Sequence, residues 1–356
     1  MIKALVVEDS AVVREYLIHI LNSDPEIIVI GSAVNGEEAI AFLKNTIPDV
    51  ITMDIHMPRM DGFEATRRIM ETTPVPIVIV SGSTNRSEVA ITMQALEAGA
   101  LTFIARPLGI GSPGYKEEAE TFNKTVKLMS EIKVVHRWNS ATKGRFTQAA
   151  GTDYRKPVDK KTIDAEIDMI AIGASTGGPI AIKKILSILP GTVPAPILIV
   201  QHISLGFVYG MADWLNRDSI SSVSVASHGE TVYPGHAYLA PDGFHMGITT
   251  EGRIILANGE PEYGLRPSVS FLFRSVLNSY GKRASGVLLT GMGKDGALEL
   301  LQMRKNGCLT FAQNEASSVV NGMPGEAVRL DAADFVLSPE EIAVTLGKIV
   351  ALKRRP

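Results

Sequence analysis

Short apolar runs alternate with helix-length segments over the first part of the chain. The runs expected to form strands lie at residues 2–7, 27–33, 50–53, 77–80 and 101–105. Continuous apolar runs of this length are typical of parallel strands that helices cover on both faces. The pattern therefore predicts an α/β domain with a doubly wound, five-stranded parallel sheet, completed by an amphipathic helix within residues 113–138.

The same alternation returns later in the chain, with apolar runs at residues 169–173, 196–200, 223–226, 286–289, 309–312 and 335–337. Helix-like segments at residues 181–189 and 294–305 separate some of these runs. Residues 234–256 differ because they are rich in Gly and in short strand-like pieces, which predicts an antiparallel insertion or edge. We expect a second doubly wound α/β domain with a mainly parallel sheet.

Residues 139–166 separate the two patterns and contain mainly Ser, Thr, Gly, Lys and Arg, with few large apolar residues. This composition is typical of a solvated tether. Its basic residues could contact an acidic partner, but a solvated linker is the favoured interpretation. We therefore expect a first domain at residues 1–138, a linker at residues 139–166 and a second domain at residues 167–352.

Composition and charge limit the classes of function. The 356 residues include 35 Lys and Arg against 38 Asp and Glu, so no overall charge attracts nucleic acid or an anionic membrane. The first residues turn acidic too soon for a secretory signal peptide, and no apolar run approaches membrane-spanning length. We expect a cytoplasmic protein without membrane insertion. Cys308 is the sole cysteine and lies in a strand-like segment, which predicts a small core residue.

Polar residues follow several expected strands of the first domain. They are Glu8 and Asp9 after the first strand, Asp54 after the third, Ser81 after the fourth and Arg106 after the fifth. Each residue alone is more readily explained as a turn or helix-cap residue. Together they predict one site, because ligands bind at the carboxyl ends of strands in such sheets. The carboxylates offer the hard oxygen ligands that suit Mg²⁺.

The first domain resembles the receiver domain of two-component response regulators over residues 1–107. The resemblance rests on Val-Val-Glu-Asp-Ser at residues 6–10, Met-Asp-Ile-His-Met-Pro-Arg-Met-Asp-Gly at 53–62, Val-Ser-Gly at 80–82 and Arg-Pro at 106–107. It implies that a histidine kinase phosphorylates Asp54 and that Glu8, Asp9 and Asp54 hold Mg²⁺. It also implies switch roles for Ser81, for the aromatic Phe103 and for Arg106.

Arg106 departs from the family pattern, which normally has lysine at this position. Lysine is a compact point charge, whereas arginine is a longer planar fork, so the exchange is not conservative. We expect Arg106→Lys to change the activation that a phosphodonor produces.

A second candidate site centres on residues 168–179, which read as a buried strand followed by a tight glycine turn with Ser175 at its tip. Gly173, Ser175 and Gly177 fit the G-x-S-x-G spacing of a nucleophile elbow. An ordinary glycine-rich turn, or one that binds phosphate through backbone N–H groups, is the favoured interpretation of this motif alone.

Two other strand ends change that interpretation. His202 directly follows one expected strand, and Asp295 follows another through a glycine-rich loop. Three strands thus bring a nucleophile, a base and a carboxylate to one edge, as triad chemistry requires. These residues occur along the chain in the order Ser, His, Asp, whereas the α/β-hydrolases have the order Ser, Asp, His. The nucleophile-elbow motif therefore does not assign this domain to the α/β-hydrolase fold. Dinucleotide binding is disfavoured because Ser175 replaces the middle glycine of G-x-G-x-x-G.

Residues 167 to about 350 resemble the catalytic domain of the chemotaxis protein-glutamate methylesterase family. The motifs are Ile-Gly-Ala-Ser-Thr-Gly-Gly at residues 172–178, Val-Gln-His at 200–202, Pro-Gly-His-Ala-Tyr-Leu-Ala-Pro at 234–241, Arg-Pro-Ser-Val at 266–269, Leu-Thr-Gly-Met-Gly-Lys-Asp-Gly at 289–296 and Ala-Gln-Asn-Glu-Ala-Ser-Ser-Val-Val-Asn-Gly-Met-Pro at 312–324. The resemblance implies Ser175 as nucleophile, His202 as base and Asp295 as its orienting acid. It implies an oxyanion contact from the Met292 backbone, with Thr176 in the same site.

The resemblance also implies a function. The enzyme would hydrolyse glutamate γ-methyl esters on chemoreceptors without a cofactor, with deamidation of receptor glutamines as a weaker expectation. We expect the receiver to cover the catalytic rim until Asp54 is phosphorylated. Ser270 stands where we expect an aspartate in the family; if that acid shapes the substrate groove, substrate preference would differ in this chain.

Competing classes are a non-catalytic phosphorelay or binding module and a nucleotide-binding output domain. A DNA-binding output is disfavoured because no basic recognition helix is evident.

Overall fold

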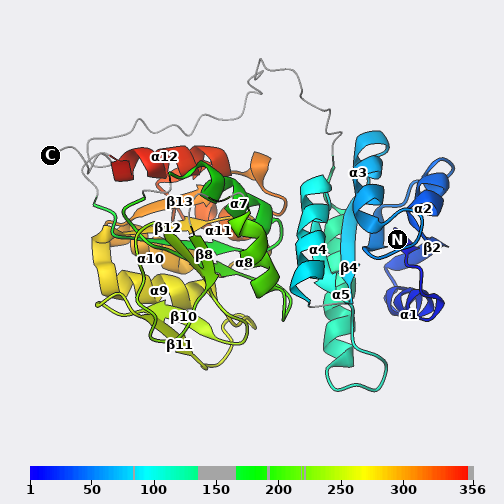
Figure 1. The fold of residues 1–356 in the computed structure, drawn as a ribbon, viewed down its shortest axis with the longest axis horizontal. Coiled ribbons are helices and arrows are strands. Elements are labelled where there is room, and N and C mark those ends of the chain that lie inside the picture. The colour runs from blue at the N-terminus through cyan, green and yellow to red at the C-terminus, as the bar shows by residue number, and fades with distance from the viewer. Residues whose placement is uncertain (83–84, 135–165, 191–192, 218, 220–221, 352–356) are drawn as a thin grey trace, which may run out of the picture. The chain divides into compact units, whose positions relative to one another are not determined.

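The protein forms two compact units, Met1–Gln148 and Ala149–Pro356, in the computed structural model (Figure 1). The structure describes residues 1–82, 85–134, 166–190, 193–217, 219 and 222–351. Apart from its last residue, the expected linker therefore lies outside the described residues. Within the described residues, no helix has both the length and the apolar character needed to span a membrane.

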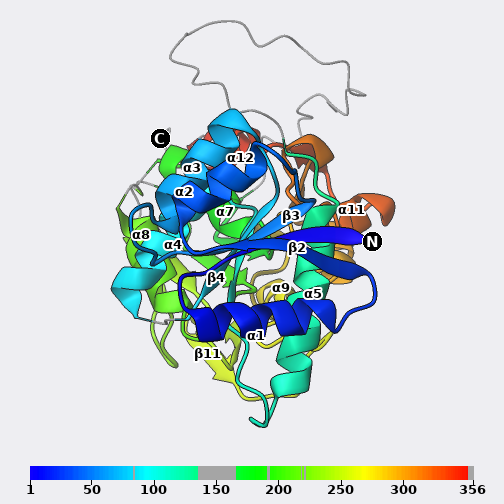
Figure 2. The same cartoon turned by 90° about the vertical axis from the view of Figure 1, so that its right-hand side faces the viewer.

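The first unit contains the expected parallel sheet, with strand order β2-β1-β3-β4-β5. The strands are β1 (Ile2–Val7), β2 (Ile27–Ala33), β3 (Val50–Asp54), β4 (Ile77–Ser81) and β5 (Thr102–Ala105). The helices are α1 (Ala11–Asn22), α2 (Gly36–Leu43), α3 (Gly62–Thr72), α4 (Arg86–Ala98) and α5 (Tyr115–Ser130). Helices α1 and α5 pack on one face of the sheet, and α2 and α3 lie on the other (Figure 2).

The second unit is built on a seven-stranded sheet with order β14-β13-β12-β6-β7-β9-β8, in which every pair is parallel. Its strands are β6 (Met169–Ala174), β7 (Ile197–Gln201), β8 (Ser222–Val225), β9 (His236–Leu239), β12 (Ala284–Leu288), β13 (Leu309–Gln313) and β14 (Phe335–Leu337). The mainly parallel α/β fold expected from the sequence is confirmed.

Helices cover this sheet on both faces (Figure 1). They are α7 (Gly178–Ile188), α8 (Val208–Asn216), α9 (Val269–Tyr280), α10 (Ala297–Lys305), α11 (Met323–Arg329) and α12 (Pro339–Ala351), with short 3-10 turns η1 (Gly281–Arg283) and η2 (Glu315–Ser317). Helix α7 packs against α12, and α9 packs against α10. The central strands β6, β7 and β12 are buried along their whole length, which explains their uninterrupted apolar sequences.

The antiparallel element expected at residues 234–256 is confirmed only in part. Strands β10 (His245–Ile248) and β11 (Ile254–Ala257) form a separate antiparallel pair. Strand β9 lies in the same stretch of sequence but joins the main sheet, parallel to β7 and β8. Its four residues are too short a run to distinguish the two cases by pattern.

Each parallel sheet reverses its strand order beside a candidate site, and the second sheet does so again at its edge, where β9 lies between β7 and β8. In the first unit, β1 lies between β2 and β3, and in the second unit β6 lies between β7 and β12. At such a point the connections leave in opposite directions, which opens a crevice beyond the carboxyl ends of the strands. Glu8 and Asp9 follow β1, Asp54 is the last residue of β3, and the candidate triad residues follow β6, β7 and β12.

Candidate functional site

Ser175 follows the last residue of β6 and lies in the turn that leads into α7. Gly177 has a φ of 77°, a conformation that favours glycine, and it caps α7, where Pro179 is at the start. The Ser175 N–H donates to the Thr290 carbonyl at 3.0 Å, and the Ser175 carbonyl accepts from the Gly178 N–H at 2.8 Å. The turn therefore has a fixed backbone, with a partly exposed Ser175 at its tip.

His202 follows β7, the strand next to β6, and its N–H donates to the Ala174 carbonyl at 2.9 Å. The imidazole Nε2 lies 3.0 Å from Asp295 Oδ2, and the His202 side chain is 9% exposed. Because Nε2 faces the carboxylate, Nδ1 is the nitrogen left for the proton of a nucleophile. This use of the two nitrogens is the reverse of that in the chymotrypsin-type triad.

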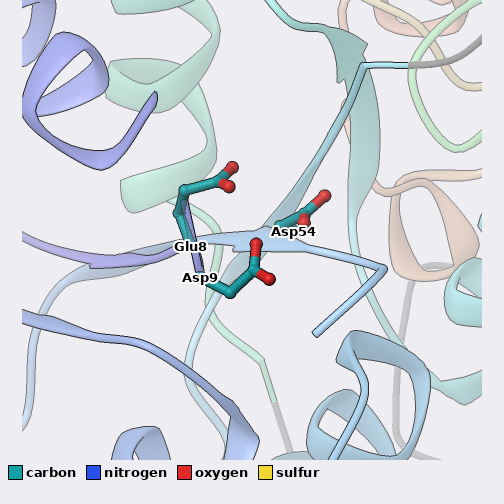
Figure 3. A group of neighbouring side chains, drawn as sticks. All are labelled: Glu8, Asp9 and Asp54. Atoms are coloured by element: carbon teal, nitrogen blue, oxygen red, sulfur yellow. The ribbon is translucent and has the colours of Figure 1, made fainter. Parts of the chain in front are cut away.

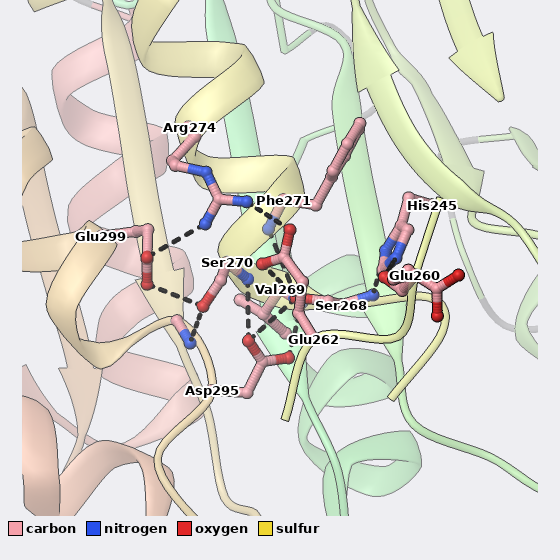
Figure 4. A network of polar contacts seen from close by, with 11 residues as sticks. His245, Glu260, Glu262, Ser268, Val269, Ser270, Phe271, Arg274, Asp295 and Glu299 are labelled. Atoms are coloured by element: carbon pink, nitrogen blue, oxygen red, sulfur yellow. Dashed lines mark hydrogen bonds and ion pairs between the residues drawn. The ribbon is translucent and has the colours of Figure 1, made fainter. Parts of the chain in front are cut away.

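Asp295 lies in the loop after β12 and is 1% exposed. Its carboxylate accepts hydrogen bonds from the start of α9: from the Val269 N–H at 2.7 Å, the Ser270 N–H at 2.9 Å and the Ser268 hydroxyl at 3.0 Å (Figure 4). Free N–H groups at a helix start favour a negative charge. Burial alone would raise the pKa of Asp295, but hydrogen bonding and charge from His202 and hydrogen bonds from Ser270 lower this pKa to about 2.

Ser270 is fully buried behind this carboxylate, so its side chain does not line a substrate groove. Its hydroxyl donates to Glu299 Oε2 at 2.7 Å and accepts from the Gly296 N–H at 2.9 Å. Arg274 then pairs with both Glu299 and Glu262 (Figure 4). Helix α9 directs the Ser270 side chain toward the protein interior, which the sequence motif alone did not indicate.

Met292, the expected oxyanion residue, and Thr176, expected in the same site, both lie near Ser175. Thr176 follows Ser175 directly, and Met292 lies in the loop between β12 and Asp295; both residues are partly exposed. Within the described part of the chain, neither the Thr176 N–H nor the Met292 N–H donates a hydrogen bond to another protein group. Gly291 brings the two segments together, since a Cβ on this residue would lie 2.6 Å from the Ser175 Cβ.

Several residues that support the site were not predicted from the sequence. Ser268 contacts Asp295 directly, and its N–H donates to His245 Nδ1 at 3.2 Å, so the buried His245 supports the acid instead of acting as a base. Gln201 and Thr290 contact the nucleophile turn. Ser268 and Gln201 both lie inside motifs that carried the family resemblance, which was the one available signal.

The first unit has a separate carboxylate cluster formed by Glu8, Asp9 and Asp54 (Figure 3). One ligand atom from each residue lies within 4.8 Å of the others, a donor set that fits a hard divalent cation such as Mg²⁺. Burial, followed by the nearby Asp54 charge, raises the pKa of Glu8 to about 7. Burial also raises the pKa of Asp54. Crowded carboxylates of this kind are stabilised when a cation neutralises them.

Of the expected switch residues, Arg106 contacts this cluster. Arg106 Nη2 lies 3.3 Å from Glu8 Oε2 and 4.0 Å from Asp54 Oδ1, so its longer side chain reaches the acids. Ser81 is buried as the last residue of β4, in register with Ala105 of β5. Phe103 lies on β5 and is partly buried.

Comparisons with known proteins find relatives for both units. The CheB methylesterase family matches residues 170–346, and the response regulator receiver domain family matches residues 4–112. The solved catalytic domain of Thermotoga maritima CheB methylesterase superposes with a TM-score of 0.50 at 34% identity, covering 52% of this chain and 99% of that one.

Full-length relatives extend the match to nearly the whole chain. A protein-glutamate methylesterase/protein-glutamine glutaminase from Syntrophus aciditrophicus is 54% identical over 98% of both chains. Another from Nitrosospira multiformis is 53% identical over 99% of this chain and 98% of the relative. The chain therefore belongs to the protein-glutamate methylesterase/protein-glutamine glutaminase family, in which a receiver domain precedes a CheB methylesterase domain.

Proposed function

We propose that this chain is a phosphorylation-regulated hydrolase that removes methyl groups from glutamate γ-methyl esters on the cytoplasmic helices of chemoreceptors. The observation that carries the proposal is the His202–Asp295 pair, 3.0 Å apart, on strand ends that flank the strand bearing Ser175. Family membership supports the activity and the class of substrate. A receptor substrate and a kinase partner place the enzyme in the cytoplasm.

The reaction is an acyl transfer in two steps. His202 Nδ1 removes the Ser175 proton as the serine oxygen attacks the ester carbonyl, while Asp295 holds Nε2–H and stabilises the imidazolium. The protonated imidazole then gives its proton to the departing methoxide, and methanol leaves. Water, activated by the same nitrogen, hydrolyses the acyl-enzyme and frees the glutamate carboxylate.

Two backbone N–H groups are suited to stabilise the oxyanion of the tetrahedral intermediate. They belong to Thr176 and Met292, on the two segments that Gly291 brings together. Removal of one such donor typically costs about 2.7–4 kcal/mol of transition-state stabilisation. Neither step requires a metal ion, because the nucleophile, base and oxyanion donors all come from the chain.

The same site would also deamidate receptor glutamines, as the names of the relatives indicate for those proteins. An amide requires protonation of a poorer leaving group, so His202 would have to act as a general acid earlier along the reaction coordinate.

The receiver domain supplies the regulation. We assign Asp54 as the phosphoryl acceptor for a histidine kinase. Glu8, Asp9 and Asp54 would hold Mg²⁺, which would neutralise charge during phosphoryl transfer. Ser81 and Arg106 would contact the phosphoryl oxygens. The Phe103 side chain would reorient when the receiver is activated. We propose that the unphosphorylated receiver restrains the catalytic domain and that phosphorylation relieves the restraint.

A non-catalytic binding module is the competing class, and it is not favoured by the family match. A serine-directed phosphonate distinguishes the two. The proposal predicts covalent labelling of Ser175 in the folded protein and its loss in His202→Ala, because the neutral imidazole activates the serine. Labelling at the same rate without His202 would remove the proposed base.

A further inference from the structure

We propose that Gln201 is a positioning residue that locks the nucleophile turn to the turn that carries the base. Its side-chain Nε2 donates to the Ser175 carbonyl at 2.8 Å and to the His202 carbonyl at 2.7 Å. One primary amide thereby connects the backbones of the nucleophile and of its base. The inference rests on the proposed roles of Ser175 and His202.

The position of Gln201 follows from the sheet. It is the last residue of β7, in parallel register with Ala174, the last residue of β6. The following residue on each strand is the catalytic one, so the two turns begin side by side. Gln201 is 5% exposed, and its side chain lies beneath both turns instead of facing substrate.

The orientation of the amide is fixed by its partners. Both N–H bonds meet carbonyl oxygens, whereas a flipped amide would bring its own oxygen against them. The Oε1 atom has no hydrogen-bond partner in the described part of the chain. It points toward Gly178, where a Cβ would lie 2.1 Å from Oε1. The site therefore tolerates an unpaired buried oxygen, a cost that is consistent with a requirement for both donors.

The opposite side of the turn is held by β12. Thr290 accepts from the Ser175 N–H through its carbonyl, and its hydroxyl donates to the Thr176 carbonyl at 2.9 Å. With Gln201 absent, the turn would keep this attachment and the bond from the His202 N–H to the Ala174 carbonyl, but the Ser175 and His202 carbonyls would lose their shared donor. A small displacement between nucleophile and base is enough to cost about 100-fold in rate.

The test measures the rate at which a serine-directed phosphonate labels Ser175 in the full chain as a function of pH, together with thermal unfolding. Gln201→Met keeps the side-chain length and removes both donors. Gln201→Glu keeps one donor only while the carboxyl is protonated. Asn216→Leu is the control, because Asn216 also donates to two carbonyls, those of Ala212 and Val223, but lies at the end of α8.

The labelling rate of the wild-type protein at each pH is the reference for the variants. Gln201→Met should label about 10- to 100-fold more slowly per folded molecule. Gln201→Glu should lose labelling as pH rises, because the ionised carboxylate would face two carbonyl oxygens. Burial raises the pKa of such a carboxyl, so the protonated form should persist to higher pH than in an exposed glutamate. Asn216→Leu should unfold at a lower temperature but keep the wild-type labelling rate and pH profile.

Wild-type labelling rates and pH profiles in both Gln201 variants would overturn the proposal, as would a lower unfolding temperature with labelling unchanged. If Gln201→Met does not fold, the pH profile of Gln201→Glu decides the question. A wild-type protein that is labelled at Ser175 but releases no methanol from methylated receptor would instead refute the proposed substrate and leave the role of Gln201 intact.

Discussion

Asp295 is buried, but His202 and its hydrogen-bond donors outweigh the effect of burial and keep it ionised. Its pKa of about 2 lies below that of an aspartate in an unfolded chain. The ionised group therefore stabilises the fold at pH values above about 4, and this contribution is lost as pH falls through about 2. The carboxylate remains available to His202 over the whole range in which a neutral imidazole can act.

Asp295→Asn should lower kcat for methyl ester hydrolysis by about 10⁴-fold, because an amide neither selects the productive imidazole tautomer nor stabilises the imidazolium. Asp334→Asn is a matched control. Asp334 also accepts from a backbone N–H, that of Thr310, and from Arg304, but it precedes β14, away from the catalytic rim. Steady-state kinetics on both variants provide the check. Equal kcat values for Asp295→Asn and wild type would contradict the role of Asp295.

Glu8 makes a corresponding prediction for the receiver. A carboxyl with a pKa of about 7 is mostly protonated in mildly acidic solution and must lose its proton to bind a cation. Mg²⁺ binding should therefore release protons below about pH 7 and strengthen as pH rises through that value. Calorimetric titration in two buffers of different ionisation enthalpy measures the release. Glu8→Gln should abolish it, and a buffer-independent heat in the wild type would count against Glu8 as a ligand.

At the scale of elements, the sequence predicted the strands well because both sheets are buried on two faces. Runs such as Ile2–Val7 and Phe335–Leu337 coincide with the observed strands. It was harder to predict which sheet a short edge strand joins and which way a side chain at a helix start points. Strand β9 could not be assigned to a sheet because four residues carry too little periodicity, and the inward direction of Ser270 depends on how α9 packs behind Asp295. The triad was inferred from strand ends, whereas its supporting contacts arise between elements distant in sequence.

Gly177 tests the geometry of the nucleophile turn. Gly177→Ala combines a strained φ of 77° with a Cβ that would lie 2.6 Å from Val319 Cγ2. Gly229 has the same φ and no neighbour within 4 Å, so Gly229→Ala isolates the backbone strain. We expect Gly229→Ala to lower the free energy of unfolding by about 1–2 kcal/mol and Gly177→Ala by about 1–3 kcal/mol more. Denaturant unfolding gives both values. Equal losses of unfolding free energy in the two variants would mean that the Val319 side chain moves aside at no energetic cost.

The whole chain joins two switch-point sites of different chemistry. The first unit presents carboxylates suited to Mg²⁺ and phosphoryl transfer, and the second presents Ser175, His202 and Asp295. Neither reaction needs a group from the other site, so we expect the connection between the two sites to be regulatory instead of catalytic.

Removing the receiver should show this regulation. A chain that begins at Thr162 keeps the whole described second domain and should hydrolyse methyl ester faster than the unphosphorylated full chain, because the restraint is lost. Full-length Asp54→Asn should stay at the low rate in the presence of a phosphodonor. A truncated chain with equal or lower activity would argue against restraint by the receiver.

The central claim is that Ser175 is the nucleophile of a protein-glutamate methylesterase. Methanol release from methylated chemoreceptor tests it most directly, with wild-type protein and Ser175→Ala compared at equal concentrations of folded protein. The account predicts steady methanol release by the wild type and a loss of at least about 10³-fold in the variant. Retained turnover in Ser175→Ala, or no release by the phosphorylated wild type, would contradict it.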